Sequence, residues 1–190
     1  GAEEESTPFV RAGSTYSYAM DARGGIWSWG DNTYGQLGRD TKKKIVFMPV
    51  KTELDGTQVE DIQCGRDHVL LLMKDGTVRA CGRNNYGQLG YSGKPTSSSE
   101  PVQVAGLENI VQIACGFDHC LARTAEGQVY AWGCNKDGQV GDGTRKHVST
   151  PYLLPLNGIT DIQGSLSYSL ALAEEGRVWG WGSNGYGQLG

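Results

Sequence analysis

The residues of this chain that could perform chemistry are two cysteine–histidine pairs with the same spacing. Cys64 lies four positions before His68, and Cys115 lies four positions before His119. Thiolate and imidazole groups are common zinc ligands, and imidazole is the side chain that most often transfers protons near neutral pH. Zinc ligands must converge at about 2.0–2.3 Å from one point. The two pairs occupy equivalent positions of a sequence repeat and should lie one repeat apart, so we expect no metal site.

The histidine position also argues against catalysis. The aligned residues of the other two repeats are Tyr16 and Tyr168, so tyrosine replaces His68 and His119. A catalytic histidine is seldom duplicated, and we interpret these side chains as polar, half-buried anchors to a neighbouring strand. The sequence has no assignable Ser-His-Asp set, carboxylate pair or Gly-Lys-Ser/Thr phosphate loop. We therefore predict no catalytic and no cofactor-binding residue.

The composition limits the compartment and the partners. The chain has 190 residues, a formal net charge of −4 and five cysteines. No segment approaches the roughly 18 apolar residues of a membrane span, and the acidic balance disfavours nucleic acid. Without a Cys-x-x-Cys pair, the odd number of cysteines favours reduced thiols in the cytoplasm or nucleus. Residues 1–8, which include Glu3, Glu4 and Glu5, are predicted to form an acidic N-terminal tail.

A ten-residue phrase rich in glycine occurs four times in the chain. The repeat that it marks must position the cysteine–histidine pairs. The copies are residues 29–38, 81–90, 132–141 and 181–190. The second residue of the phrase returns after 52, 51 and 49 residues. A unit with such a period is one supersecondary module that stacks on its neighbours. The recurring residues that we expect to be structural include Trp29, Gly30, Gly38, His68, Gly82, Gly90, His119, Trp132, Gly133, Gly141, Trp181 and Gly182.

Two polar positions recur in every copy of the phrase. The asparagines should bond to the backbone of their own turn; they are Asn32, Asn84, Asn135 and Asn184. The glutamines should form structural hydrogen bonds between repeats; they are Gln36, Gln88, Gln139 and Gln188.

The rest of the repeat has the pattern of four strands. Apolar residues alternate on both sides of a glycine turn, as around Gly76, which predicts a β-hairpin. Between hairpins, a segment led by proline (101–104) precedes a second apolar segment (110–113). Proline at the start of a strand marks a sheet edge, so the first segment is predicted to be outermost and the second innermost. Four strands in about 50 residues make a propeller blade.

The fold class that we predict is therefore all-β, a β-propeller of four-stranded antiparallel blades. About three and a half to four blades fit this chain, because the fourth unit stops before its outer strand. The predicted blades lie near residues 9–52, 59–104, 110–156 and 159–190.

The repeat resembles that of the regulator of chromosome condensation family. The segments that carry the resemblance are Ile113 to Ala122, with Gly-x-x-His, and Val129 to Asn135, with Val-Tyr-x-Trp-Gly-x-Asn. The resemblance covers residues 9–190 and implies a ring of usually seven blades, of which this chain would form part. It leaves open whether further blades or a second copy completes the ring, and a longer polypeptide is the favoured interpretation.

The non-repeating loops are the better candidates for a binding site, because the scaffold does not account for them. They follow each copy of the phrase and carry positive charge. The candidate partner-binding rim consists of Arg39, Lys42, Lys43, Lys44, Lys94, Arg145, Lys146 and His147. The alternative is that these are only solvated loop residues.

We predict a protein–protein interaction scaffold that binds a partner through its blade loops. The alternative is guanine-nucleotide exchange on a Ran-like small GTPase, which the resemblance implies and which uses an inserted wedge in that family. The segments between the predicted 26-residue blocks differ by at most four residues, so this stretch has no obvious wedge. The cysteines disfavour a secreted bacterial effector, and the acidic N-terminus disfavours chromatin binding through a basic tail.

Overall fold

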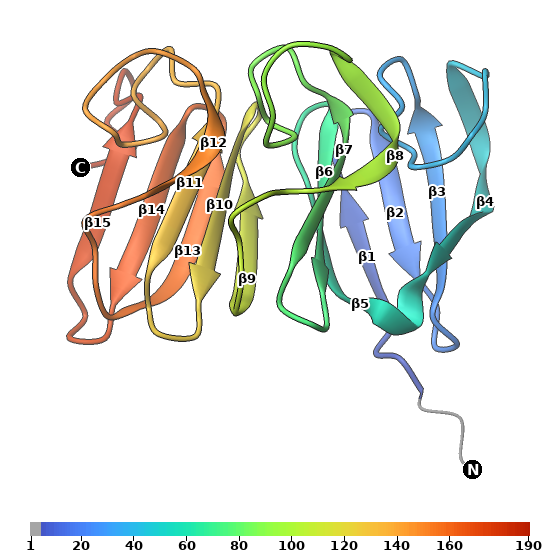
Figure 1. Ribbon diagram of the computed structural model, residues 1–190, viewed down its shortest axis with the longest axis horizontal. Helices are drawn as coiled ribbons and strands as arrows, with labels where there is room; N and C mark the ends of the chain where they lie inside the picture. The colour runs from blue at the N-terminus through green and yellow to red at the C-terminus, as the bar shows by residue number, and fades with distance from the viewer. Residues whose placement is uncertain (1–4) are drawn as a thin grey trace.

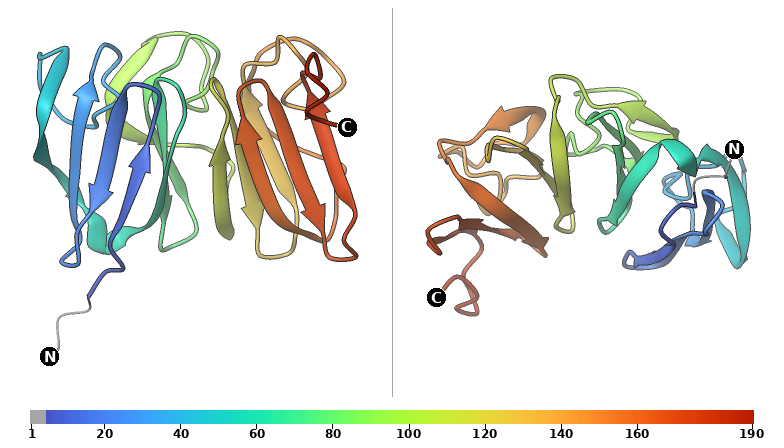
Figure 2. Two further views of the ribbon diagram at one scale, coloured as in Figure 1. Left: turned by 180° about the vertical axis from the view of Figure 1, so that it is seen from behind. Right: turned by 90° about the horizontal axis from the view of Figure 1, so that it is seen from below.

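The computed structural model describes residues 5–190, and these residues form four antiparallel β-sheets that stand side by side in an arc (Figure 1; Figure 2). The first four residues of the predicted acidic tail lie outside the described residues, and Glu5 is exposed. The all-β class and the propeller-blade architecture are confirmed. The single helical element of the described part is a 3₁₀ turn, Gly56–Gln58.

Three sheets have four strands and the last has three. The first contains β1 (Phe9–Ala12), β2 (Tyr16–Met20), β3 (Gly25–Asp31) and β4 (Ile45–Asp55). The second contains β5 (Val59–Cys64), β6 (His68–Met73), β7 (Val78–Arg83) and β8 (Ser97–Gln103). The third contains β9 (Ile110–Cys115), β10 (His119–Thr124), β11 (Val129–Gly133) and β12 (Val148–Leu153). The fourth contains β13 (Ile159–Ser165), β14 (Tyr168–Ala173) and β15 (Val178–Gly182).

The order of strands within each sheet follows the chain, as the sequence predicts. The first strands, β1, β5, β9 and β13, contact one another from sheet to sheet and form the inner edge of the arc. The last strands, β4, β8 and β12, form the outer edges. Figure 2 shows this arrangement along the axis of the arc.

The prolines of the outer strands do not begin them, which corrects the sequence prediction. Each of these strands starts three or four residues earlier, and Pro49, Pro101 and Pro151 lie inside β4, β8 and β12. The ladder with the preceding strand shifts register beside each proline. A proline without an N–H fits such a bulge on an edge strand, so the edge position is confirmed although the strand start is not.

The recurring Trp-Gly or Cys-Gly pairs end the third strand of each blade with a glycine in the left-handed region. The φ angles of Gly30, Gly82, Gly133 and Gly182 are 103–104°. A Cβ on Gly133 would lie 2.6 Å from the carbonyl oxygen of Asp118. The φ angle and this contact both exclude a larger residue. Glycine therefore allows the end of the third strand to stay packed against the turn between the first two strands.

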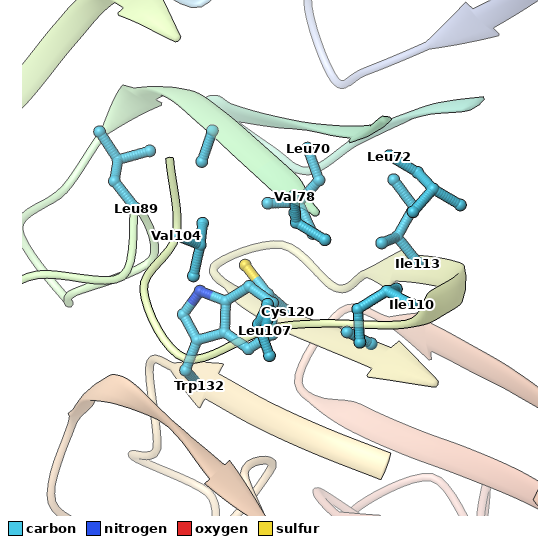
Figure 3. Packing of buried hydrophobic residues seen from close by; sticks show 12 residues of the cluster. Leu70, Leu72, Val78, Leu89, Val104, Leu107, Ile110, Ile113, Cys120 and Trp132 are labelled. Atoms are coloured by element: carbon cyan, nitrogen blue, oxygen red, sulfur yellow. The ribbon is translucent and has the colours of Figure 1, made fainter. Parts of the chain in front are cut away.

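The hydrophobic core is divided among the three sheet-to-sheet interfaces. At the middle interface, Leu70 and Val78 of the second sheet pack against Ile113, Cys120 and Trp132 of the third (Figure 3). The first and last interfaces have equivalent clusters. The small residues Ser28, Ala80 and Ala131 are completely buried and allow the sheets to approach closely.

The residues at the histidine position link each sheet to the next. The hydroxyl of Tyr16 lies 2.8 Å from the carbonyl oxygen of Gly65 and 2.7 Å from that of His68, and its single proton can be donated to either. The Nε2 atom of His68 lies 3.2 Å from Sγ of Cys120, and that of His119 lies 2.9 Å from Oγ of Ser169.

The predicted half-burial of His68 and His119 is wrong, because both are completely buried. The neighbouring blade covers the face that a single repeat leaves open. Their partners also belong to that blade rather than to an adjacent strand of the same sheet.

Candidate protein-interaction surface

The long connections between the third and fourth strands lie at one end of the array (Figure 1). They comprise residues 32–44, 84–96 and 134–147, and we call them together the loop surface. The short β1–β2, β5–β6 and β9–β10 turns lie at the same end, whereas the β2–β3, β6–β7 and β10–β11 turns lie at the other (Figure 1). Residues far apart in the sequence therefore meet on one surface.

Buried asparagines fix the path of these loops. The side-chain oxygen of Asn135 accepts a hydrogen bond from the N–H of Val140 at 3.0 Å. Its amide group donates to Asp142 Oδ1 at 2.9 Å and to the carbonyl oxygen of Lys146 at 2.9 Å. The equivalent oxygens of Asn32, Asn84 and Asn184 accept from the backbone in the same way, as predicted. Each loop is thus held in a defined shape by its own repeat.

The glutamines behave differently from the prediction. The side-chain oxygen of Gln88 accepts from the N–H of Tyr86 at 2.8 Å, within the same turn, and the other three copies do the same. It is the backbone carbonyl of Gln88 that reaches the next blade, where it accepts from Nε1 of Trp132 at 3.0 Å. The side chain takes the local partner because an N–H two residues away is already within reach.

The structure places most of the predicted basic rim on the exposed part of the loop surface. Exposed members are Lys42, Lys43, Lys44, Lys94, Arg145, Lys146 and His147. Two of them make only long contacts with backbone oxygens: Lys44 to Thr33 at 3.4 Å and Arg145 to Lys136 at 3.5 Å. Lys44 and Arg145 are therefore held weakly and remain accessible to a partner, whereas Nδ1 of His147 accepts a hydrogen bond from the N–H of Asn135 at 3.2 Å.

Arg39 does not belong with the other basic residues. It is half-buried in a cavity of about 620 Å³ between β4 and β8, which Lys51, Glu53 and Glu100 also line. Its Nε and Nη2 atoms are buried without a hydrogen-bond partner. The structure thus separates Arg39 from the lysines that follow it in the sequence.

An arginine and three aromatic rings form a row across the loop end of three blades; sequence reasoning named His147 but missed the other three residues. The guanidinium of Arg83 lies 4.7 Å from the ring centre of Tyr34 and 5.8 Å from that of Tyr86. The ring of Tyr86 lies 4.7 Å from that of His147. We call Tyr34, Arg83, Tyr86 and His147 the aromatic row. Arginine and aromatic side chains provide much of the binding energy at protein interfaces.

Carboxylates of the short turns orient the arginines of this surface. Asp67 Oδ2 lies 3.6 Å from Arg83 Nη1, and Arg66 forms an ion pair with Asp118. Arg66 also lies over the ring of Phe117, which is exposed, at 5.4 Å. Burial raises the pKa of Asp67, and the charges of Arg66 and Arg83 oppose that shift. The ion pairs hold the guanidinium groups in place while one face of each remains stacked on an aromatic ring.

The sequence contained one sign that the tyrosines of the phrase face outward. Tyr34, Tyr86 and Tyr186 occupy the same position, and the third copy has Asp137 there. An aspartate is rarely tolerated in a core position, so the slot had to be accessible. Tyr186 of the last blade is 99% exposed, whereas Tyr34 and Tyr86 are half-buried between neighbouring loops.

The described residues contain no group of three or more His, Cys, Asp or Glu side chains arranged to hold a metal ion. All five cysteines are free. In residues 5–190, no helix has the length and apolar character needed to cross a membrane.

Comparisons with known proteins agree with the architecture. A family model described as an RCC1-like domain matches residues 3–190. The human E3 ubiquitin-protein ligase HERC2 is 39% identical over 132 residues, which are 68% of this chain and 3% of that protein.

Two solved structures share the fold. The human WBSCR16 structure has a TM-score of 0.81 and 30% identity, and the match covers 92% of this chain and 47% of that one. Prp20p of Saccharomyces cerevisiae, whose structure was described with its binding properties to Gsp1p and histones, has a TM-score of 0.78 and 24% identity. That match covers 92% of this chain and 44% of Prp20p. The chain thus spans less than half of each solved relative and a small fraction of HERC2.

Proposed function

Because the chain belongs to the family of RCC1-like domains, we propose that it is a protein-interaction scaffold that binds its partner through the loop surface. The relatives carry names with different activities: HERC2 is a ubiquitin-protein ligase, and Prp20p was studied for its binding to Gsp1p and histones. One repeat architecture that occurs in such different proteins supports a shared role in recognition more than a shared reaction.

The aromatic row is the observation that carries this proposal. Arg83 lies 4.7 Å from the ring centre of Tyr34 and 5.8 Å from that of Tyr86, and Asp67 also holds it, so binding would cost little side-chain entropy. The row continues to the exposed His147 of the third blade. A partner that covers it would bury preorganised aromatic and guanidinium groups, which are typical of interface hot spots.

The exposed lysines and arginine of the loop surface have a second role in the proposal. Charges at the rim of an interface mainly increase the association rate and its dependence on salt. On a chain with a formal net charge of −4, a local group of cations would favour a partner with an acidic surface.

The experiment is affinity capture with the full-length protein and two sets of variants. A Y34A/R83A/Y86A variant removes three of the four side chains of the row, and a K42S/K43S/K44S/R145S/K146S variant removes five of the exposed cations. We expect that a protein captured by the wild type is not captured by the first variant. Its binding to the second variant should be weaker and should depend less on salt. A matched D40S variant should leave binding unchanged. Retention of all bound proteins by the first variant would contradict the proposal.

Nucleotide exchange on a Ran-like small GTPase is the alternative function. It is supported by the fold shared with Prp20p and by that protein's description with Gsp1p. The three connections that form the loop surface have nearly equal lengths, so a wedge would have to come from elsewhere in the protein. Release of a fluorescent guanine nucleotide from the GTPase tests this directly. Acceleration by micromolar full-length protein would establish exchange, and no acceleration would exclude it.

We also infer that further sheets of the same kind cover the two end faces of the arc. Val10 on the first sheet and Val178 on the fourth are 73% and 64% exposed, at positions where interior blades bury aliphatic residues. The matched propellers are about twice as long as this chain, which supports further blades over a second copy. If the full-length protein is a monomer in solution and both end faces are protected from hydrogen exchange, the result would support further blades. A dimer that forms through these faces would favour a second copy.

The free thiols support a reducing compartment, the cytoplasm or the nucleus, for this domain.

A further inference from the structure

Cys115 and Cys120 lie directly opposite each other on the antiparallel strands β9 and β10. The N–H of Gly116 donates to the carbonyl oxygen of His119 at 3.1 Å in the turn that joins the strands. The adjacent pair, Cys115 and Cys120, is therefore a non-hydrogen-bonded pair, where facing side chains come closest. Such residues have Cβ atoms near the lower end of about 4.5–5.5 Å, close to the range that a disulfide spans.

Both thiols face the second blade, where the side chain of His68 lies beside them. The Nε2 atom of His68 lies 3.2 Å from Sγ of Cys120, and both side chains are completely buried. Cys120 also donates to the carbonyl oxygen of Gln88 at 3.3 Å. Cys115 donates to the carbonyl oxygen of Gln63 at 3.7 Å. Two thiols and one imidazole thus share the interface between blades two and three.

Cys115 is the accessible member of the pair. It is half-buried and lines a cavity of about 270 Å³ at the end of the inner strands, together with Cys64, Gly116 and Phe117. Burial raises the pKa of Cys115, but the Cys120 thiol and His68 outweigh burial, so the net shift is downward. A lowered pKa increases the fraction of thiolate, which is the nucleophilic form.

The equivalent positions of the other blades lack this combination. In the second blade, Cys64 faces Val69, and the neighbouring blade places Tyr16 rather than a histidine beside it. Burial raises the pKa of Cys64. In the fourth blade, Gly164 faces Ser169, which contacts His119. Repeat packing does not require a thiol at either position, so the scaffold alone does not account for the pair.

We propose that Cys115 and Cys120 form a redox-responsive dithiol that a hydroperoxide converts to a disulfide. The sulfur of Cys115 attacks the peroxide and breaks its O–O bond. Cys115 becomes a sulfenic acid, oxidised by two electrons, and the peroxide is reduced to water or an alcohol. The sulfur of Cys120 then attacks that of Cys115, one S–S bond forms, and the hydroxyl leaves as water with the proton of Cys120. A dithiol reductant reverses the change.

The test exposes the reduced full-length protein to increasing hydrogen peroxide and analyses tryptic peptides by mass spectrometry. Cys115 and Cys120 fall in one peptide, residues 84–123, and Cys64 falls in another. We expect the first peptide to lose two hydrogen atoms at least about tenfold faster than Cys64 is oxidised, because its thiolate fraction is larger. Dithiothreitol should restore the mass. Oxidation of Cys115 at the rate of Cys64, or without a disulfide, would overturn the proposal.

Two variants separate the steps, and the other blades show that the fold accommodates them. C120V copies Val69, and it should stop at a Cys115 sulfenic acid that dimedone traps. C115A copies Ala12, and it should leave Cys120 reduced at the same peroxide concentration. Dimedone labelling of Cys120 in C115A, or a disulfide at Cys115 in C120V, would contradict the assigned roles.

Discussion

The three interior interfaces and the two end faces use the same residue pattern with opposite outcomes. Val129 in the third blade is completely buried, whereas its equivalent in the fourth blade, Val178, is 64% exposed. Ile62 is completely buried, whereas its equivalent Val10 is 73% exposed. A repeat therefore specifies a surface that can pack, and the neighbouring blade decides whether that surface contributes to stability.

The copies of the phrase also differ in the burial and the hydrogen bonds of their asparagine and tryptophan side chains. The side chain of Asn135 is completely buried and has several hydrogen-bond partners, whereas the side chain of Asn184 in the last blade is exposed and accepts only from the N–H of Leu189. Trp132 and Trp181 both pack against the blade that precedes their own. Trp132 donates to the carbonyl oxygen of Gln88, whereas Nε1 of Trp181 is buried without a hydrogen-bond partner. The hydrogen bonds of the phrase therefore differ from copy to copy even where two blades meet.

The largest difference should be seen between the tryptophans of the phrase. Trp132→Ala in the 190-residue chain removes a completely buried ring and its hydrogen bond, and should lower the free energy of unfolding by about 3–5 kcal/mol. Trp29→Ala, on the outer face of the first sheet, should cost about 1 kcal/mol, since Trp29 is only half-buried. Urea unfolding measures both values, and equal values would contradict the comparison.

A smaller, matched pair tests whether the end face is covered. Val129→Ala should cost about 2 kcal/mol, and Val178→Ala less than about 0.5 kcal/mol in the 190-residue chain, because only the first valine is buried. If another blade packs on the fourth sheet in the full-length protein, the cost of Val178→Ala should rise there to that of Val129→Ala. A cost that stays small in the full-length protein would argue against that blade.

Acid should act on the interior interfaces through His119. Burial, with a smaller contribution from His68, lowers the pKa of His119 from about 6.5 to about 3. The folded state therefore keeps this side chain neutral. Its contribution to the free energy of unfolding is complete above pH 6.5 and declines as the pH falls toward 3. The loss should approach about 1.4 kcal/mol for each pH unit below 6.

His119→Tyr is the control, because tyrosine occupies this position in the first and fourth blades. The difference in unfolding free energy between the wild type and this variant should depend on pH over that window. A pH-independent difference would show that His119 does not carry the effect.

The smallest effect is expected for the exposed tyrosine of the last blade. Tyr186→Ala should change the free energy of unfolding by less than about 0.5 kcal/mol, because the side chain is 99% exposed. Tyr86→Ala should cost more, since the ring packs against Arg83 and His147. Thermal unfolding can rank the two variants, and the reverse order would indicate that the aromatic row is not preassembled.

Much of the fold could be predicted from the sequence because it depends on local pattern. Alternating apolar residues, the turn around Gly76 and the recurring Asn135 position define strands and loops within one repeat. The candidate surface was predicted only in part. The exposed lysines were found from their charge, but the row around Arg83 joins loops that are about 50 residues apart, and no local pattern signals that contact.

The sequence by itself determined the blade: its four strands, their order and the glycine turns that end them, since these follow from the side-chain periodicity of one module. Only the tertiary structure decided which blade faces are covered, that His68 meets Cys120, and that Arg39 turns away from Lys42. The physical reason is that burial and hydrogen-bond partners across an interface belong to two sheets at once, so a single repeat does not specify them.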